Sequence, residues 1–244
     1  FSEFLQFKNV PVDKTTAGTG RLEKALEEYL TYGGFPEVVI STDKIDKIEL
    51  LSSYFRDIIG LDIAEVSGEN VSTIEAFGKY VISASYFSAS KALNSFKSLG
   101  YKIAKQSLLD LEKFSQESYL FFFVPIFSYS IKDRSQYPRK AYLGDTGFMY
   151  ALEGKTDWGR LFENQVYLKL RRSYLSPIEI NYWKNREGKE VDFVLLEGFK
   201  AKEIIQVVYN LDEEKTKERE LSGLIACAKE FGLKQGLVIT RDID

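Results

Sequence analysis

Gly188-Lys189-Glu190-Val191-Asp192-Phe193-Val194 is the stretch that decides the fold of the C-terminal part of the chain. Val and Phe at alternate positions predict a β-strand that carries Glu190 and Asp192 on one face. Upstream, a helical pattern contains Glu163, and downstream Glu203-Ile204-Ile205-Gln206-Val207-Val208 predicts another strand with a polar residue inside it. This order predicts one polar pocket formed by a helix and two strands.

The elements around this pocket can be assigned from their periodicity. A helix is expected over 157–172, strands over 178–183, 190–196 and 203–209, a helix over 213–231 and a last strand over 236–240. The resulting αβββαβ order is the common core of restriction-endonuclease-like folds. We therefore predict a domain of this α/β class over 151–244.

Two further units are expected before this domain. Residues 1–69 form a helical segment with helices over 21–32 and 47–66. Residues 70–150 read as three helices (72–83, 90–99 and 104–119) followed by two strands (120–130 and 140–143), with a polar loop over 132–139. This layout predicts a winged helix in which the third helix reads the DNA groove and the loop is the wing. The whole chain is then a multidomain protein of α+β and α/β character.

Composition excludes several classes of protein. The 244 residues include 33 basic and 36 acidic side chains, for a net charge of −3, so nucleic acid would have to bind a local patch. Histidine is absent, which excludes Ser-His-Asp and Cys-His catalysis. The single cysteine fits a reducing cytoplasm. No apolar run approaches the roughly 20 residues that span a bilayer, so no membrane partner is expected. The string Gly-x4-Gly-Lys-Ser/Thr is absent, so this chain should not hydrolyse ATP by that route.

The acidic pocket has two interpretations. Charge in a core strand is costly unless it is paired or binds metal, and Mg²⁺ takes a few carboxylates together with waters and phosphate oxygens. Such an ion could activate water against a phosphodiester. In the alternative, Glu190 and Asp192 lie in solvent at a strand end or pair with Arg160 or Lys184. The residues alone leave both interpretations open.

Several motifs, taken in order, resemble those of a family of predicted archaeal and bacterial AAA-type ATPases. They are Ser2-Glu3-Phe4-Leu5, Tyr32-Gly33-Gly34-Phe35-Pro36-Glu37, Tyr54-Phe55-Arg56-Asp57-Ile58, Lys140-Ala141-Tyr142-Leu143-Gly144-Asp145-Thr146-Gly147 and Arg219-Glu220. Residues 155–240 look like the C-terminal PD-(D/E)XK nuclease-like domain of this family. The resemblance implies that a P-loop ATPase core precedes Phe1, that ATP binds only there, and that this core is a partner of the chain.

The nuclease pattern can be carried over residue by residue. Glu163 matches the helical acid and Asp192 the central metal-binding Asp, with Glu190 as a further metal ligand. Gln206 stands where a second acid is expected, and Val208 where the catalytic Lys is expected. The resemblance thus implies Glu163, Asp192 and Gln206 as catalytic residues, while the two departures predict a degenerate site. Three other lysines could supply the missing ammonium: Lys184, Lys189 and Lys202.

Basic residues of the winged unit are candidates for DNA binding, because phosphate contacts need only Lys and Arg on one side. The candidates chosen are Lys102, Lys105, Arg134 and Arg139. The same basic stretch contains Lys91, Lys97, Lys132 and Lys140. Acidic residues interrupt it, so an ordinary solvated face is the alternative.

Together these patterns predict the C-terminal DNA-binding or regulatory part of a predicted ATPase, with a degenerate nuclease-like core. A metal-dependent DNA endonuclease is the first alternative, so enzymatic activity stays open. A protein-interaction module that docks a partner on the ATPase is the second. The sequence does not determine the substrate, the physiological partner or the oligomeric state.

Overall fold

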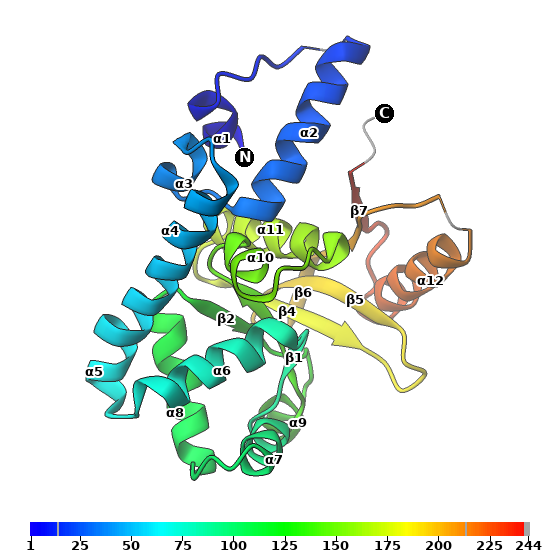
Figure 1. Ribbon diagram of the computed structural model, residues 1–244. Helices are drawn as coiled ribbons and strands as arrows, with labels where there is room; N and C mark the ends of the chain where they lie inside the picture. Colours follow the sequence, from blue (N-terminus) through cyan, green and yellow to red (C-terminus); the bar gives the residue numbers. More distant parts are fainter. Residues whose placement is uncertain (14, 213, 242–244) are drawn as a thin grey trace. The chain divides into compact units, whose positions relative to one another are not determined.

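The computed structural model describes residues 1–13, 15–212 and 214–241, and the chain divides into two compact units. The first unit comprises Phe1–Phe123 and Ala141–Asp157, and the second comprises Val124–Lys140 and Trp158–Asp244. The chain therefore leaves the first unit after Phe123 and returns to it at Ala141 (Figure 1).

The first unit begins with helices, as expected for residues 1–69. They are α1 (Ser2–Phe7), α2 (Thr16–Tyr32), α3 (Pro36–Ile40), α4 (Lys44–Asp57), the π-helix η1 (Ile58–Ile63) and α5 (Ala64–Ser67). Thr15 caps α2 by accepting a hydrogen bond from the Gly18 amide at 3.0 Å. Asp43 caps α4 in the same way, with its carboxylate 2.7 Å from the Ile45 amide nitrogen.

Three more helices and a small sheet follow, with a further helix at the end of the unit. They are α6 (Val71–Ser83), β1 (Tyr86–Phe87), α7 (Ala89–Ser98), α8 (Lys105–Glu117), β2 (Phe121–Val124), β3 (Arg139–Leu143) and α10 (Gly147–Glu153). The sheet order is β1-β3-β2. Phe121, Phe122 and Phe123 are buried, because a continuous apolar strand needs cover on both faces.

The predicted hairpin over 120–143 is wrong in its details. The strand expected over 120–130 ends at Val124, directly before Pro125, which cannot donate to a β-ladder. The loop expected over 132–139 contains a short helix, α9 (Ile131–Gln136). Ser130 begins this helix by accepting a hydrogen bond from the Asp133 amide at 3.2 Å.

Residue Gly33 occupies a backbone conformation that other residues rarely adopt, with φ at 75°. The Asp145 carboxylate packs against it and accepts hydrogen bonds from the amides of Gly34 and Gly147, both at 2.8 Å. A Cβ atom at position 33 would lie 1.6 Å from one Asp145 carboxylate oxygen. This contact joins two of the motifs quoted above inside the first unit.

We expect Gly33→Ala to destabilise the chain by about 2–3 kcal/mol, because it combines backbone strain with the loss of the Asp145 hydrogen bonds. Denaturant unfolding followed by circular dichroism would measure the change. The matched control is Gly20→Ala in the interior of α2, where a new Cβ meets nothing within 4 Å. That control should be neutral or slightly stabilising. Equal stabilities for the two variants would contradict the prediction.

From Trp158 onward, the second unit has the element order that the sequence predicts. It contains α11 (Trp158–Ser173), β4 (Ile178–Lys184), β5 (Glu190–Glu197), β6 (Lys200–Val208), α12 (Glu214–Phe231) and β7 (Leu237–Thr240). The strands form one sheet in the order β4-β5-β6-β7 (Figure 1). The first two pairings are antiparallel and β6 pairs with β7 in parallel, because α12 connects them as a crossover.

Helix α12 packs on β5 and β6 and closes an apolar core that includes Val191, Leu224 and Cys227. The Cys227 side chain is fully buried, and burial raises the pKa of its thiol to about 12. Burial of this kind is typical of a structural cysteine.

The segment Val124–Lys140 belongs to the second unit because it lies along β4. The Phe127 amide donates to the Tyr182 carbonyl at 2.6 Å, and the Tyr182 amide donates to the Pro125 carbonyl at 3.0 Å. The Tyr182 hydroxyl donates to the Pro138 carbonyl at 2.6 Å. These bonds hold both ends of the segment on the sheet and thereby bring Lys140 to the predicted pocket.

Candidate functional site

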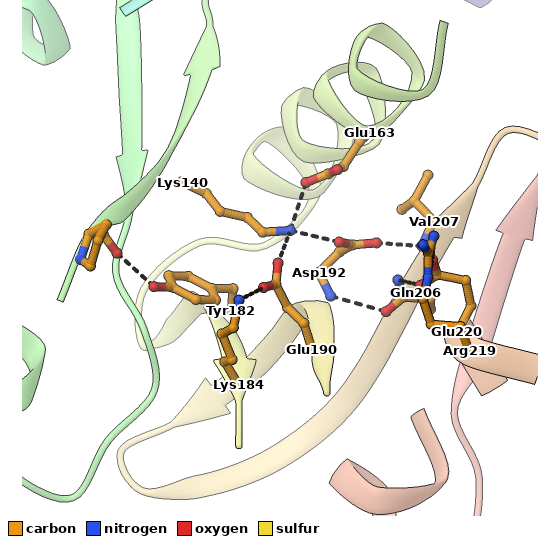
Figure 2. Close-up of polar contacts among 11 residues, drawn as sticks. Lys140, Glu163, Tyr182, Lys184, Glu190, Asp192, Gln206, Val207, Arg219 and Glu220 are labelled. Carbon is orange, nitrogen blue, oxygen red and sulfur yellow. Dashed lines mark hydrogen bonds and ion pairs between the residues drawn. The ribbon is translucent and has the colours of Figure 1, made fainter. Parts of the chain in front are cut away.

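A buried lysine ammonium lies at the centre of the predicted acidic pocket. The Lys140 Nζ atom is 2.7 Å from Asp192 Oδ1, 3.0 Å from Glu163 Oε1 and 3.1 Å from Glu190 Oε1 (Figure 2). We refer to these four residues as the Lys140 cluster. All four belong to the second unit, and the Lys140 and Asp192 side chains are buried.

Three elements position the cluster. Glu163 extends from α11, Glu190 and Asp192 share one face of β5, and Lys140 comes from the start of β3. The prediction that Glu163, Glu190 and Asp192 approach one another is confirmed by their common contact with a single nitrogen atom. The centre of the Tyr182 ring, on β4, lies 5.9 Å from the Lys140 Nζ atom, so the ring covers one side of the ammonium.

Asp192 is the most deeply buried acid of the cluster. Its Oδ2 atom accepts a hydrogen bond from the Val207 amide at 2.8 Å, while Oδ1 faces Lys140. Burial raises the pKa of Asp192 to about 7, although the Lys140 ammonium and the Val207 amide act in the opposite direction. The negative charge of Glu163 adds to the increase. Desolvation therefore outweighs the ion pair at this carboxyl group.

Gln206 connects Asp192 to helix α12. Its Oε1 atom accepts a hydrogen bond from the Asp192 amide at 3.2 Å, and its Nε2 atom donates to Glu220 Oε2 at 2.6 Å. Arg219 in turn pairs with Glu220 at 2.5 Å. The amide of Gln206 thus bonds a backbone group and a second carboxylate instead of pointing its oxygen toward Lys140. Val208, at the position expected for a catalytic lysine, is buried.

The cluster does not fit a divalent cation while Lys140 is in place. The ammonium occupies the point at which the three carboxylates converge, and its hydrogen atoms fill the oxygen lone pairs that would bind a metal. Within 1–13, 15–212 and 214–241, no group of three or more His, Cys, Asp or Glu side chains is arranged to hold a metal ion. Any step that needs Mg²⁺ would first require Lys140 to move.

The sequence did not identify the central residue. Lys140 was grouped with basic residues expected to face DNA, and that assignment is wrong because the side chain is buried. The available signal was its place at the start of the apolar run Ala141-Tyr142-Leu143, where a lysine needs a buried partner. The alternative pairing of Glu190 with Lys184 is confirmed, at 3.0 Å, and it coexists with the Lys140 contact.

The four predicted DNA-binding residues fall in different units. Lys102 and Lys105 precede and begin α8 in the first unit, whereas Arg134 of α9 and Arg139 of β3 belong to the second. The Arg134 guanidinium lies 5.5 Å from the centre of the Phe199 ring. A DNA contact by these residues stays a prediction.

Comparison with known proteins assigns the chain to a family. Residues 23–158, more than half of the chain, match a family model described as "Domain of unknown function (DUF8612)". The chain belongs to this family. Residues 158–242 match a second model, "Domain of unknown function (DUF4143)", so the two matches meet at the first residue of α11. No solved structure gives a significant match.

Two relatives are themselves uncharacterised. The chain is similar to "Uncharacterized protein MJ1544" from Methanocaldococcus jannaschii, with 33% identity over 238 residues, which are 96% of this chain and 53% of the relative. An "Uncharacterized protein" from Haemophilus influenzae is 26% identical over 227 residues, which are 87% of this chain and 52% of the relative. The chain thus spans about half the length of the curated relatives it matches. In the part of the chain that the structure describes, no helix is long and apolar enough to cross a membrane.

Proposed function

We propose that this chain is the DNA-binding, non-cleaving C-terminal part of a longer ATPase-type protein. The observation that carries the proposal is the position of Lys140, whose ammonium stands where a nuclease of this pattern would hold its cation. Val208 supports the same conclusion, because an apolar residue occupies the position of the expected catalytic lysine.

The ATPase part of the proposal rests on length and on motif resemblance. Both relatives are about twice as long as the aligned region, which leaves room for a second domain of ordinary size. The motifs from Ser2 to Glu220 resemble those that follow a P-loop core in predicted ATPases. A P-loop string in the sequence that precedes Phe1 in the intact protein would support this assignment, and its absence would contradict it.

DNA binding is supported by two arrangements. The order α6, β1, α7, α8, β2, α9, β3 and the sheet β1-β3-β2 support the interpretation as a winged helix, in which α8 would be the groove-reading helix. The αβββαβ order from α11 to β7 resembles the common core of restriction-endonuclease-like folds, which supports the same proposal.

A metal-dependent endonuclease is the second candidate. It is favoured by the convergence of Glu163, Glu190 and Asp192 on a point that lies within 3.1 Å of one oxygen from each. Displacement of Lys140 by the substrate would be needed before these oxygens could bind a metal. The two candidates therefore differ in whether magnesium produces cleavage.

Incubation with supercoiled plasmid and Mg²⁺ or Mn²⁺, beside Asp192→Asn and a chelator control, separates the candidates. We expect no nicking above the chelator background for either protein, together with duplex binding that weakens steeply between 50 and 200 mM salt, by about 10-fold for every two phosphates contacted. Metal-dependent nicking that Asp192→Asn abolishes would overturn the proposal and establish the endonuclease. Absence of DNA binding at low salt would overturn the DNA-binding part.

A further inference from the structure

Two aromatic rings of the second unit lie side by side on the surface. Tyr129 and Phe199 are 65% and 56% exposed, and their ring centres are 5.9 Å apart with 30° between the ring planes. They come from segments about 70 residues apart in sequence. We refer to them as the aromatic pair.

Turn chemistry does not explain Phe199. It occupies the two-residue connection between β5 and β6 together with Gly198, whose φ of 60° supplies the conformation that the hairpin requires. The other turn position is ordinarily a small polar residue, because it faces water. Phe199 instead joins Tyr129 in an exposed aromatic patch, and exposed apolar patches often mark binding sites.

The aromatic pair has a rigid support. Phe127 contacts the Tyr129 ring edge-on at 5.0 Å and the Phe231 ring of α12 at 4.9 Å. Phe127 is buried in the apolar core of the second unit. The Tyr129 ring is therefore packed against the core, which reduces the entropy lost when a flat ligand stacks on it.

Three basic residues accompany the pair, one in contact and two close in sequence. The Arg134 guanidinium lies 5.5 Å from the Phe199 ring centre, and Lys132 and Lys200 are exposed neighbours in sequence. The nearby acids have partners within the protein. Asp133 accepts a hydrogen bond from Ser128 at 3.2 Å, and Glu197 pairs with Lys202. Bases offer flat rings and phosphates offer negative charge, so this surface is complementary to a single strand of nucleic acid.

We propose that the aromatic pair and Arg134 bind single-stranded nucleic acid by base stacking and phosphate contact. This inference rests on the proposed DNA-binding function and specifies the form of DNA that this surface takes. It also explains a residue at the hairpin tip that neither the fold nor the Lys140 cluster requires.

Fluorescence anisotropy with a labelled oligothymidine of about 16 nucleotides tests the proposal. Tyr129→Ala and Phe199→Ala are each expected to weaken binding by about 5- to 150-fold. Tyr129→Leu and Phe199→Leu keep apolar area but lose the aromatic face, so they should weaken binding almost as much. Arg134→Gln should also lower the salt dependence of binding by about one phosphate contact. Leu175→Ala, which removes an exposed side chain elsewhere in the second unit, is the control.

The outcomes are distinguishable. Wild-type binding to oligothymidine that the aromatic variants leave unchanged would overturn this inference and leave the proposed function standing. Failure of the wild type to bind either oligothymidine or duplex would overturn both. If Phe199→Ala changes the oligomeric state in sedimentation without changing oligothymidine affinity, the surface joins copies of the chain and the inference is wrong.

Discussion

At pH 8, replacing Lys140 with methionine is expected to destabilise the second unit by about 3–5 kcal/mol, because the buried Asp192 must then carry unpaired charge or take up a proton. Methionine has a similar length and keeps most of the packing, so the loss reports the charge. Glu163, Glu190 and Asp192 would then face one another with no ammonium within 3.1 Å of all three. Like charges in a poorly solvated site repel strongly.

Tryptophan fluorescence measures this effect in the correct part of the chain. The 2 tryptophans of the sequence are Trp158 and Trp183, and both belong to the second unit. The matched control is Lys184→Met, which removes the other ammonium that pairs with Glu190, at 3.0 Å. The Lys184 side chain is 43% exposed, so its loss should cost no more than about 1 kcal/mol. Equal decreases in the unfolding free energy of Lys140→Met and Lys184→Met would show that burial gives Lys140 no special role.

Divalent cations should stabilise the Lys140→Met variant and leave the wild type unchanged. In Lys140→Met no ammonium separates the three carboxylates, so Mn²⁺ or Mg²⁺ that draws them together should raise the unfolding midpoint of this variant in proportion to the logarithm of its concentration. The wild type should show no such shift, because its ammonium already occupies the position. A wild-type shift as large as that of the variant would mean that cations bind without displacing Lys140.

The second large effect is a change of folding stability with pH, whose sign is unusual for a carboxyl group. The pKa of Asp192 is raised from 3.8 to about 7 by burial, so the folded state binds this proton more tightly than the unfolded state. Its contribution to stability is fully present below about pH 4 and is lost as the pH rises through about 7. At about 1.4 kcal/mol for each pH unit, the loss amounts to about 4 kcal/mol across the window. Most carboxylates of folded proteins have the opposite sign.

Comparison with Asp192→Asn isolates this contribution. The variant cannot titrate at residue 192, so the difference between the two unfolding free energies should change by several kcal/mol between pH 4 and pH 7 and then level off. Absolute stabilities are less informative, because the asparagine amide places a donor beside Lys140 or Val207. A difference that is constant with pH would show that Asp192 titrates in the folded protein as it does in the unfolded chain.

Local patterns in the sequence predicted most of the second unit. Strand alternation placed Glu190 and Asp192 on one face of β5, and helical periodicity placed Glu163 on α11. The αβββαβ order followed from the same patterns, because each element carries its own apolar repeat. Loops were less predictable. The short helix α9 depends on a cap at Ser130 and lies inside a stretch that reads as polar loop.

The partner of the three carboxylates could not be predicted in this way. Lys140 lies 23 residues before Glu163 and 52 before Asp192, and nothing in its immediate neighbours specifies either contact. The aromatic pair raises the same difficulty, since Tyr129 and Phe199 belong to segments that meet only after folding. Sequence distance does not limit which side chains meet once a segment lies along a strand.

By itself the sequence determined the type and order of the elements from α11 to β7 and the acids that they carry, since these depend on short-range periodicity and on the choice of each residue. Tertiary structure alone decided what those acids bind. Backbone hydrogen bonds between Tyr182 and the segment that ends at Lys140 bring a lysine into the pocket. Its ammonium neutralises carboxylates that burial would otherwise destabilise, and it occupies the position of a metal ion.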